Sequence, residues 1–142
     1  MVGLLLPPSS GGAIGNLAVM CAGRVPVNLN YTAAQESVDS AIAQCEIRTV
    51  FTSRRFIDKI GSDKLPQGAT VKTVYLEDLL GGISRVELIM RHLQGLLLPH
   101  SLLRHSAWAH EGGKEALATV IFSSGSTGEP KGVMPVLSLI HI

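Results

Sequence analysis

The chain has 142 residues, of which 46% are hydrophobic and 16% are charged, and its formal net charge is +1 at pH 7. This length and composition are typical of one globular domain with a buried core, and they exclude a disordered chain. So small a charge creates no field that would gather nucleic acid, and the 4% of aromatic residues offer little surface for base stacking, so we expect no nucleic-acid partner.

Apolar, β-branched runs alternate with amphipathic segments along the first half of the chain. Strands are predicted at 2–6, 25–29, 48–52 and 71–76, with helices ending at Gly23 and spanning 32–44 and 53–60. Such alternation predicts right-handed βαβ units. The expected fold class is therefore α/β, with a partial parallel sheet flanked by helices.

Capping residues and apolar spacing indicate where these helices start and which face they bury. Ser9 or Ser10 is expected to cap the first helix, which would bury one face formed by Ile14, Leu17, Ala18 and Cys21. Thr32 is expected to cap the second helix, with Gln35 at the capping-box position. The predicted inward side chains of the second and third helices are Val38, Ile42, Cys45, Phe56, Ile57 and Ile60.

The cysteines and the N-terminal segment bear on the compartment. Cys21 and Cys45 are too far apart for a metal knuckle, and we expect two buried thiols in a reducing environment. The apolar run at 1–6 has no basic leader and stops at Pro7-Pro8, so it does not resemble a signal peptide. The expected location is the cytoplasm.

The segment Ser10–Gly15 allows an alternative function. It follows a strand and is rich in glycine, as in a dinucleotide-binding oxidoreductase domain of the Rossmann type. However, its glycines lack the Gly-x-Gly-x-x-Gly spacing, and the next strand ends in Asn28 and Asn30 instead of an acidic residue. A tight strand-to-helix turn is the preferred interpretation.

Residues 83–105 break the alternation. Their apolar stripe comprises Ile83, Val86, Ile89, Met90, Leu93 and Leu97. With arginine and histidine flanks, this segment could be the working part of a non-catalytic lipid-interface module, but a core-facing helix is the preferred prediction. The histidines at 92, 100, 105 and 110 are not at zinc-ligand spacing, so no metal site is expected.

The one stretch that implies a reaction follows a predicted buried strand at 116–122. Residues 123–132 combine four hydroxyls, three glycines and one lysine, groups that let backbone N–H donors and a mobile charge surround a polyphosphate. It is not the usual P-loop, because the lysine follows Pro130 and no Ser or Thr stands beside it for magnesium. The candidate ATP phosphate-binding residues are Ser123, Ser124, Gly125, Ser126, Thr127, Gly128, Lys131 and Gly132.

Residues 124–132, Ser-Gly-Ser-Thr-Gly-Glu-Pro-Lys-Gly, resemble the phosphate-binding signature of the adenylate-forming superfamily at all nine positions. The stretches 26–32 and 52–56 look like the acyl-carrier-protein synthetase part of bacterial bifunctional 2-acylglycerophosphoethanolamine acyltransferases. The resemblance covers most of residues 2–134. It implies an AMP-binding domain fragment at 1–134.

By resemblance, the parent uses ATP and Mg²⁺ to convert a fatty acid into acyl-AMP and then into a thioester with acyl carrier protein or CoA. Gly125, Ser126, Thr127 and Gly128 would hold the β and γ phosphates, and Lys131 would offset the charge growing on pyrophosphate. The family's catalytic residues are expected downstream, so this fragment should be inactive alone. The parent is expected in the cytoplasm, with residues 83–105 as the segment that would contact the inner membrane.

The last residues, 135–142, depart from the family pattern. Leu137–Ile142 is what CTG TCT CTT ATA CAC ATC encodes, the transposase end used in sequencing libraries. We therefore expect 135–142 to be a non-native tail.

Overall fold

The computed structural model describes residues 1–66, 70–99, 117–123 and 131–136. In chain order the elements are β1 (Val2–Leu5), α1 (Ser10–Cys21), β2 (Pro26–Asn28), α2 (Gln35–Gln44), β3 (Thr49–Thr52), α3 (Arg54–Ile60), a 3₁₀ turn (Ser62–Lys64), β4 (Lys72–Tyr75), α4 (Leu76–Gly81), α5 (Arg85–Leu97), β5 (Val120–Ser123) and β6 (Lys131–Val133). All of the predicted strands are present, each within a few residues of its predicted bounds.

The strands form one sheet in the order β4-β3-β1-β2-β5-β6. The first five are parallel, and only β6 runs antiparallel, next to β5. Because the chain crosses from β2 back over β1 to reach β3, strand order reverses between β1 and β3, as in doubly wound folds. The predicted fold class, a partial parallel sheet flanked by helices, is confirmed.

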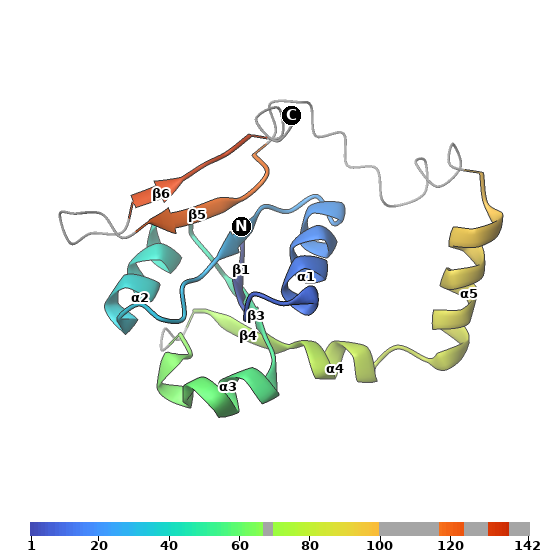
Figure 1. The fold of residues 1–142 in the computed structure, drawn as a ribbon, viewed down its shortest axis with the longest axis horizontal. Coiled ribbons are helices and arrows are strands. Elements are labelled where there is room, and N and C mark those ends of the chain that lie inside the picture. The colour runs from blue at the N-terminus through green and yellow to red at the C-terminus, as the bar shows by residue number, and fades with distance from the viewer. Residues whose placement is uncertain (67–69, 100–116, 124–130, 137–142) are drawn as a thin grey trace.

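The core lies on the face of the sheet that α2 and α3 cover (Figure 1). Strands contribute Leu5, Val27 and Val50, each fully buried, and the helices add the predicted inward residues Val38, Ile42, Cys45, Phe56 and Ile57. At roughly 25 cal/mol per Å² of apolar area, this packing is the main stabilising term. Ile60 packs against the same cluster but is only partly buried.

Helix α1 lies on the other face of the sheet (Figure 1), and the prediction of its buried side was wrong. Ser9 is the N-cap, as expected, and its hydroxyl accepts a hydrogen bond from the Gly12 N–H at 3.3 Å. Ile14 and Leu17, however, are 66% and 60% exposed, and only Val19 is buried. Asn16 faces the sheet instead, because its side-chain amide forms hydrogen bonds with the amide of Asn28 on β2.

The capping prediction for α2 was also wrong. The N-cap position is Ala34, which makes no side-chain hydrogen bond. Thr32 instead directs its backbone N–H and its hydroxyl to Asn30 Oδ1, at 3.0 and 2.7 Å. Asn30 thereby closes a local turn that competes with the predicted cap.

Helix α4 is short and follows β4 directly, with the acidic residues Glu77 and Asp78 in its first turn, where the helix dipole favours them. One further prediction, on the cysteines, needs correction. Cys45 is buried as predicted, whereas Cys21 is exposed, because α1 turns a different side to the sheet.

Helix α5 stands apart from the sheet in Figure 1, following α4. None of its residues is buried, so the prediction of a core-facing helix was wrong for the described part of 83–105. The apolar stripe of α5 is exposed along its length, since Val86 is 70% exposed and Leu97 is 73% exposed. No helix in the described parts of the chain is long and apolar enough to cross a bilayer.

Candidate functional site

The predicted phosphate loop is joined to the sheet by the β5–β6 ladder. The pairs are Ile121 with Val133, Phe122 with Gly132, and Ser123 with Lys131. The two ends of the candidate site are therefore cross-strand neighbours. Five of the candidate residues, Ser124, Gly125, Ser126, Thr127 and Gly128, lie outside the described residues.

Gly132 has a structural reason to be glycine. It faces Phe122 across the ladder, and a Cβ at this position would lie 3.2 Å from Phe122 Cε1. Phe122 in turn packs against the core cluster. The absence of a side chain at Gly132 thus lets an aromatic ring anchor the antiparallel strand.

A small polar cluster fixes β5 to the rest of the sheet. Asn16 and Asn28 exchange two amide hydrogen bonds, at 3.0 and 2.9 Å, and Asn28 Nδ2 also donates to Thr119 Oγ1 at 3.3 Å. Thr119 Oγ1 donates to the Pro26 carbonyl at 2.9 Å. Asn28 stands near the position where a Rossmann-type domain would have an acidic residue, and its amide links α1, β2 and the approach to β5.

The parallel strands bring several loops to one edge of the sheet. The carboxyl ends of β1, β3 and β5 lie at the same edge, so the first turn of α1 and the start of α3 lie there, and β5 ends there at Ser123. Ligands of open α/β sheets bind at this edge. Strand β2 lies between β1 and β5, so β1 and β5 are two inter-strand steps apart, about 10 Å.

Sequence reasoning missed a charged network at this edge. Glu77 accepts hydrogen bonds from Ser53 Oγ at 2.7 Å and from the Arg54 backbone N–H at 3.1 Å. The Ser53 hydrogen bond is the main reason why the pKa of Glu77 falls from 4.5 to about 2. Arg54 pairs with Asp78 at 2.6 Å and lies over the Tyr75 ring, with Cζ 4.2 Å from its centroid.

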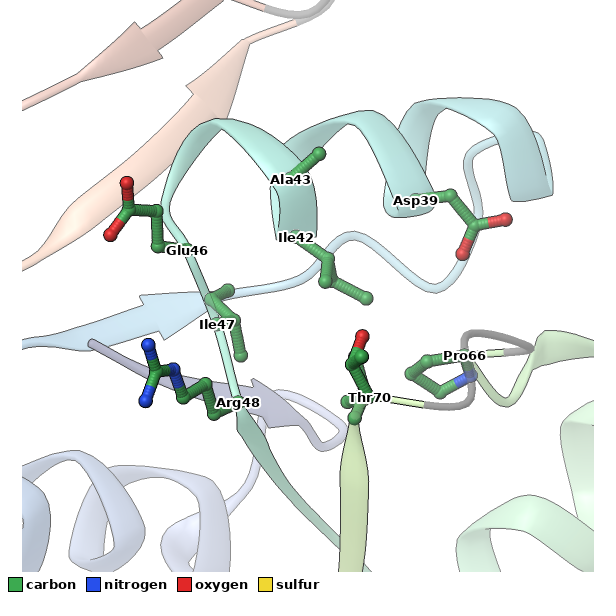
Figure 2. A pocket seen from close by; sticks show the side chains of 9 residues that line it. Asp39, Ile42, Ala43, Glu46, Ile47, Arg48, Pro66 and Thr70 are labelled. Atoms are coloured by element: carbon green, nitrogen blue, oxygen red, sulfur yellow. The ribbon is translucent and has the colours of Figure 1, made fainter.

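Figure 2 shows a hollow at the opposite, amino edge of the sheet, near the starts of β3 and β4. It measures about 610 Å³, and Ile42 of α2 points into it towards Thr70. Its charged side chains are Asp39, Glu46 and Arg48. With two carboxylates against one guanidinium, this hollow is unsuited to a polyphosphate.

Among the described residues, no group of His, Cys, Asp and Glu side chains is placed to hold a metal ion. The described features suited to a nucleotide are the carboxyl edge and the β5–β6 ladder, whose ends enclose the hydroxyl- and glycine-rich sequence.

Comparison with known protein families matches residues 1–135 to the AMP-binding enzyme model. The chain belongs to the AMP-binding enzyme family. The matched range includes the candidate phosphate-binding residues at 123–132.

Tyrocidine synthase 3 of Brevibacillus parabrevis is 28% identical to this AMP-binding chain over 134 residues, which is 94% of the chain and 2% of the synthase. Among solved structures, VinN in complex with 3-methylaspartate has a TM-score of 0.63 at 22% identity over 98% of the chain and 34% of VinN. The o-succinylbenzoate CoA synthetase of Bacillus subtilis, in complex with its acyl-adenylate intermediate, has a TM-score of 0.64 at 17% identity, covering 95% of the chain and 29% of that enzyme.

The chain thus spans about a third or less of these relatives. The structural matches support the fold of the first part of an adenylate-forming enzyme. The family match also disfavours the Rossmann-type oxidoreductase and the non-catalytic lipid-interface module, the two alternatives raised by the sequence.

Proposed function

We propose that this chain is the phosphate-loop part of an ATP-dependent synthetase that adenylates a fatty acid. The observation that carries the ATP part of the proposal is the hydroxyl- and glycine-rich sequence between paired strands at the carboxyl edge of a parallel sheet. The fatty-acid part rests on the resemblance of 26–32 and 52–56 to acyl-carrier-protein synthetases. ATP supplies the adenylyl group that activates the carboxylate, with loss of pyrophosphate, and the acyl group then passes to the thiol of acyl carrier protein or CoA.

Each part of the phosphate loop has a distinct proposed task. Gly125 and Gly128 permit close approach of backbone N–H groups to the β and γ phosphates, and Ser126 and Thr127 add hydroxyl donors. Lys131 supplies positive charge where negative charge grows as pyrophosphate departs, so its effect is greatest in the transition state. The three phosphates also call for Mg²⁺, whose ligands we assign to the remainder of the parent.

The fatty-acid assignment is tested in the full-length parent. Purified parent is incubated with ATP and, separately, fatty acids of several chain lengths, amino acids and an aromatic acid, and acyl-AMP is detected by mass spectrometry. We expect acyl-AMP from the fatty acids, followed by thioester when acyl carrier protein or CoA is added. Adenylates from amino acids alone would refute the substrate class but not adenylation.

The 142-residue chain is expected to form no adenylate, because it spans only about a third of the solved structures that it matches. Acyl-AMP produced by this purified chain would contradict that proposal.

We also propose a cytoplasmic parent that touches the inner membrane through residues 83–105. Support comes from the exposed stripe of α5, with Ile89 at 59% and Leu96 at 73% exposure. Co-sedimentation with anionic liposomes should fall when Leu96 and Leu97 are both replaced by serine. Unchanged co-sedimentation would exclude α5 as the contact.

A further inference from the structure

A second hollow lies at the carboxyl edge, between the ends of β1, β3 and β4, and the function proposed above does not use it. It is bounded by the segment after β1, the first turn of α1, helix α3 and the start of α4. Its volume is about 530 Å³. This is within the range of small-molecule sites, roughly 300–1,000 Å³.

The hollow occupies the topological switch point of the sheet. From β1 the chain passes through α1 to β2 on one side, and from β3 it passes through α3 to β4 on the other side. The segments that follow β1 and β3 therefore diverge, and a crevice opens between them. Strand order alone thus creates a space at this position.

One part of the lining is apolar. Leu6, Phe56 and Leu76 are among its lining residues, and Leu80, which also lines it, is 66% exposed and so stands at the mouth. Gly12 leaves the α1 side without a side chain, and it does so of necessity, because a Cβ there would lie 2.6 Å from the Pro7 carbonyl oxygen. This wall suits a short hydrocarbon chain.

The other part of the lining is cationic. Arg55 and Lys59 lie one turn apart on α3 and both line the hollow. The only ion pair in the described parts of the chain is Arg54 with Asp78, so neither Arg55 nor Lys59 is neutralised there. Glu77 also lines the hollow, and its carboxylate accepts hydrogen bonds from the Ser53 hydroxyl and the Arg54 backbone N–H. The charged side chains of the lining are therefore two cations and one carboxylate, so cationic charge exceeds anionic charge there.

We infer that this hollow is a binding site for a small amphipathic anion, in which Arg55 and Lys59 hold a carboxylate or phosphate head and Leu6, Phe56 and Leu76 contact an apolar tail. It is separate from the end of β5 at Ser123, because β5 lies two strands from β1, and it does not depend on ATP binding by residues 123–132. A carboxylate and a phosphate share the required chemistry, so the test includes both.

The test uses the 142-residue chain and isothermal titration with octanoate, octyl phosphate and 1-octanol, each below its aggregation concentration. We expect saturable binding of one or both anions at one site and much weaker binding of the neutral alcohol. The double variant R55A/K59A should bind the anions about tenfold more weakly, because two charge-assisted contacts are lost. The double variant K72A/R85A removes the same charge from exposed positions outside the hollow and should bind as the original chain does.

Two more variants separate this site from the exposed stripe of α5. Leu80→Glu places a carboxylate at the mouth without disturbing buried packing, and it should weaken anion binding. L96S/L97S should leave octanoate binding unchanged, because neither leucine lines the hollow. The inference is overturned if no anion binds, if octanol binds as tightly, if R55A/K59A and L80E bind normally, or if L96S/L97S abolishes binding.

Discussion

The sheet with α2 and α3 and the arm formed by α4 and α5 are both rich in apolar residues, yet only the first buries them. Val50 in the sheet is fully buried, whereas Leu97 in the arm is 73% exposed. In the sheet region, strands fix the spacing of side chains and two helices cover one face. In the arm, the apolar stripe of α5 has no buried residue. Amphipathic spacing therefore predicts a helix, whereas burial also requires a facing element.

Large-to-small substitutions should give the largest difference between the two regions. Leu5→Ala, at a fully buried position in β1, should lower the free energy of unfolding by about 3 kcal/mol, because it opens a cavity in the core. Leu97→Ala should change it by less than about 0.5 kcal/mol. Urea unfolding followed by circular dichroism measures both. A cost for Leu97→Ala close to that of Leu5→Ala would mean that α5 is packed in solution.

A smaller effect is expected from the polar cluster on the α1 face. Asn28→Ala should destabilise by about 1–2 kcal/mol, because Asn16 and Thr119 lose partners in a partly buried place. Gln44→Ala is a matched control, since Gln44 donates only to Ser40 on the exposed side of its own helix. Equal costs for the two variants would show that the cluster does not fix β5 and α1 to the sheet.

The order of strands and helices along the chain was predictable, because apolar strands alternate clearly with amphipathic helices from Val2 to Tyr75. The buried face of α2 was also predictable, since Val38, Ile42 and Cys45 have helical spacing. For α1, apolar spacing gave the wrong face because the Asn16–Asn28 amide pair turns polar groups inward. A partner more than ten positions away cannot be read from a local pattern.

The candidate site was partly predictable. Residue types at 123–132 predict a phosphate loop, and this assignment stays a prediction, because 124–130 lie outside the described residues. The ladder that joins its two ends is described. Strand β6 was not predicted, because Lys-Gly-Val is short and gains its strand geometry only by pairing with β5. Glu77 was also missed, because its role depends on Ser53, which is close only after β3 and β4 pair.

The smallest effect on stability is expected from Glu77, whose hydrogen bonds join α4 of the arm to the start of α3 beside the sheet. Because folding lowers the pKa of Glu77 from 4.5 to about 2, its contribution is complete above pH 4.5 and is lost as the pH falls towards 2. Glu77→Gln should therefore be less stable than the original chain near pH 6, by at most about 1 kcal/mol, and the difference should vanish near pH 2. Urea midpoints across this range measure it. A difference that grows on acidification would contradict the assigned hydrogen bonds.

The most direct test of the phosphate loop is Lys131→Ala in the full-length parent, with Lys72→Ala as a control that removes an exposed lysine at the start of β4. Pyrophosphate release reports the rate of adenylation, and equilibrium titration reports fatty-acid affinity. If Lys131 stabilises departing pyrophosphate, its removal should slow adenylation about 10²-fold or more and leave fatty-acid affinity nearly unchanged. Equal losses of rate and affinity, or no loss of rate, would contradict the role given to residues 123–132.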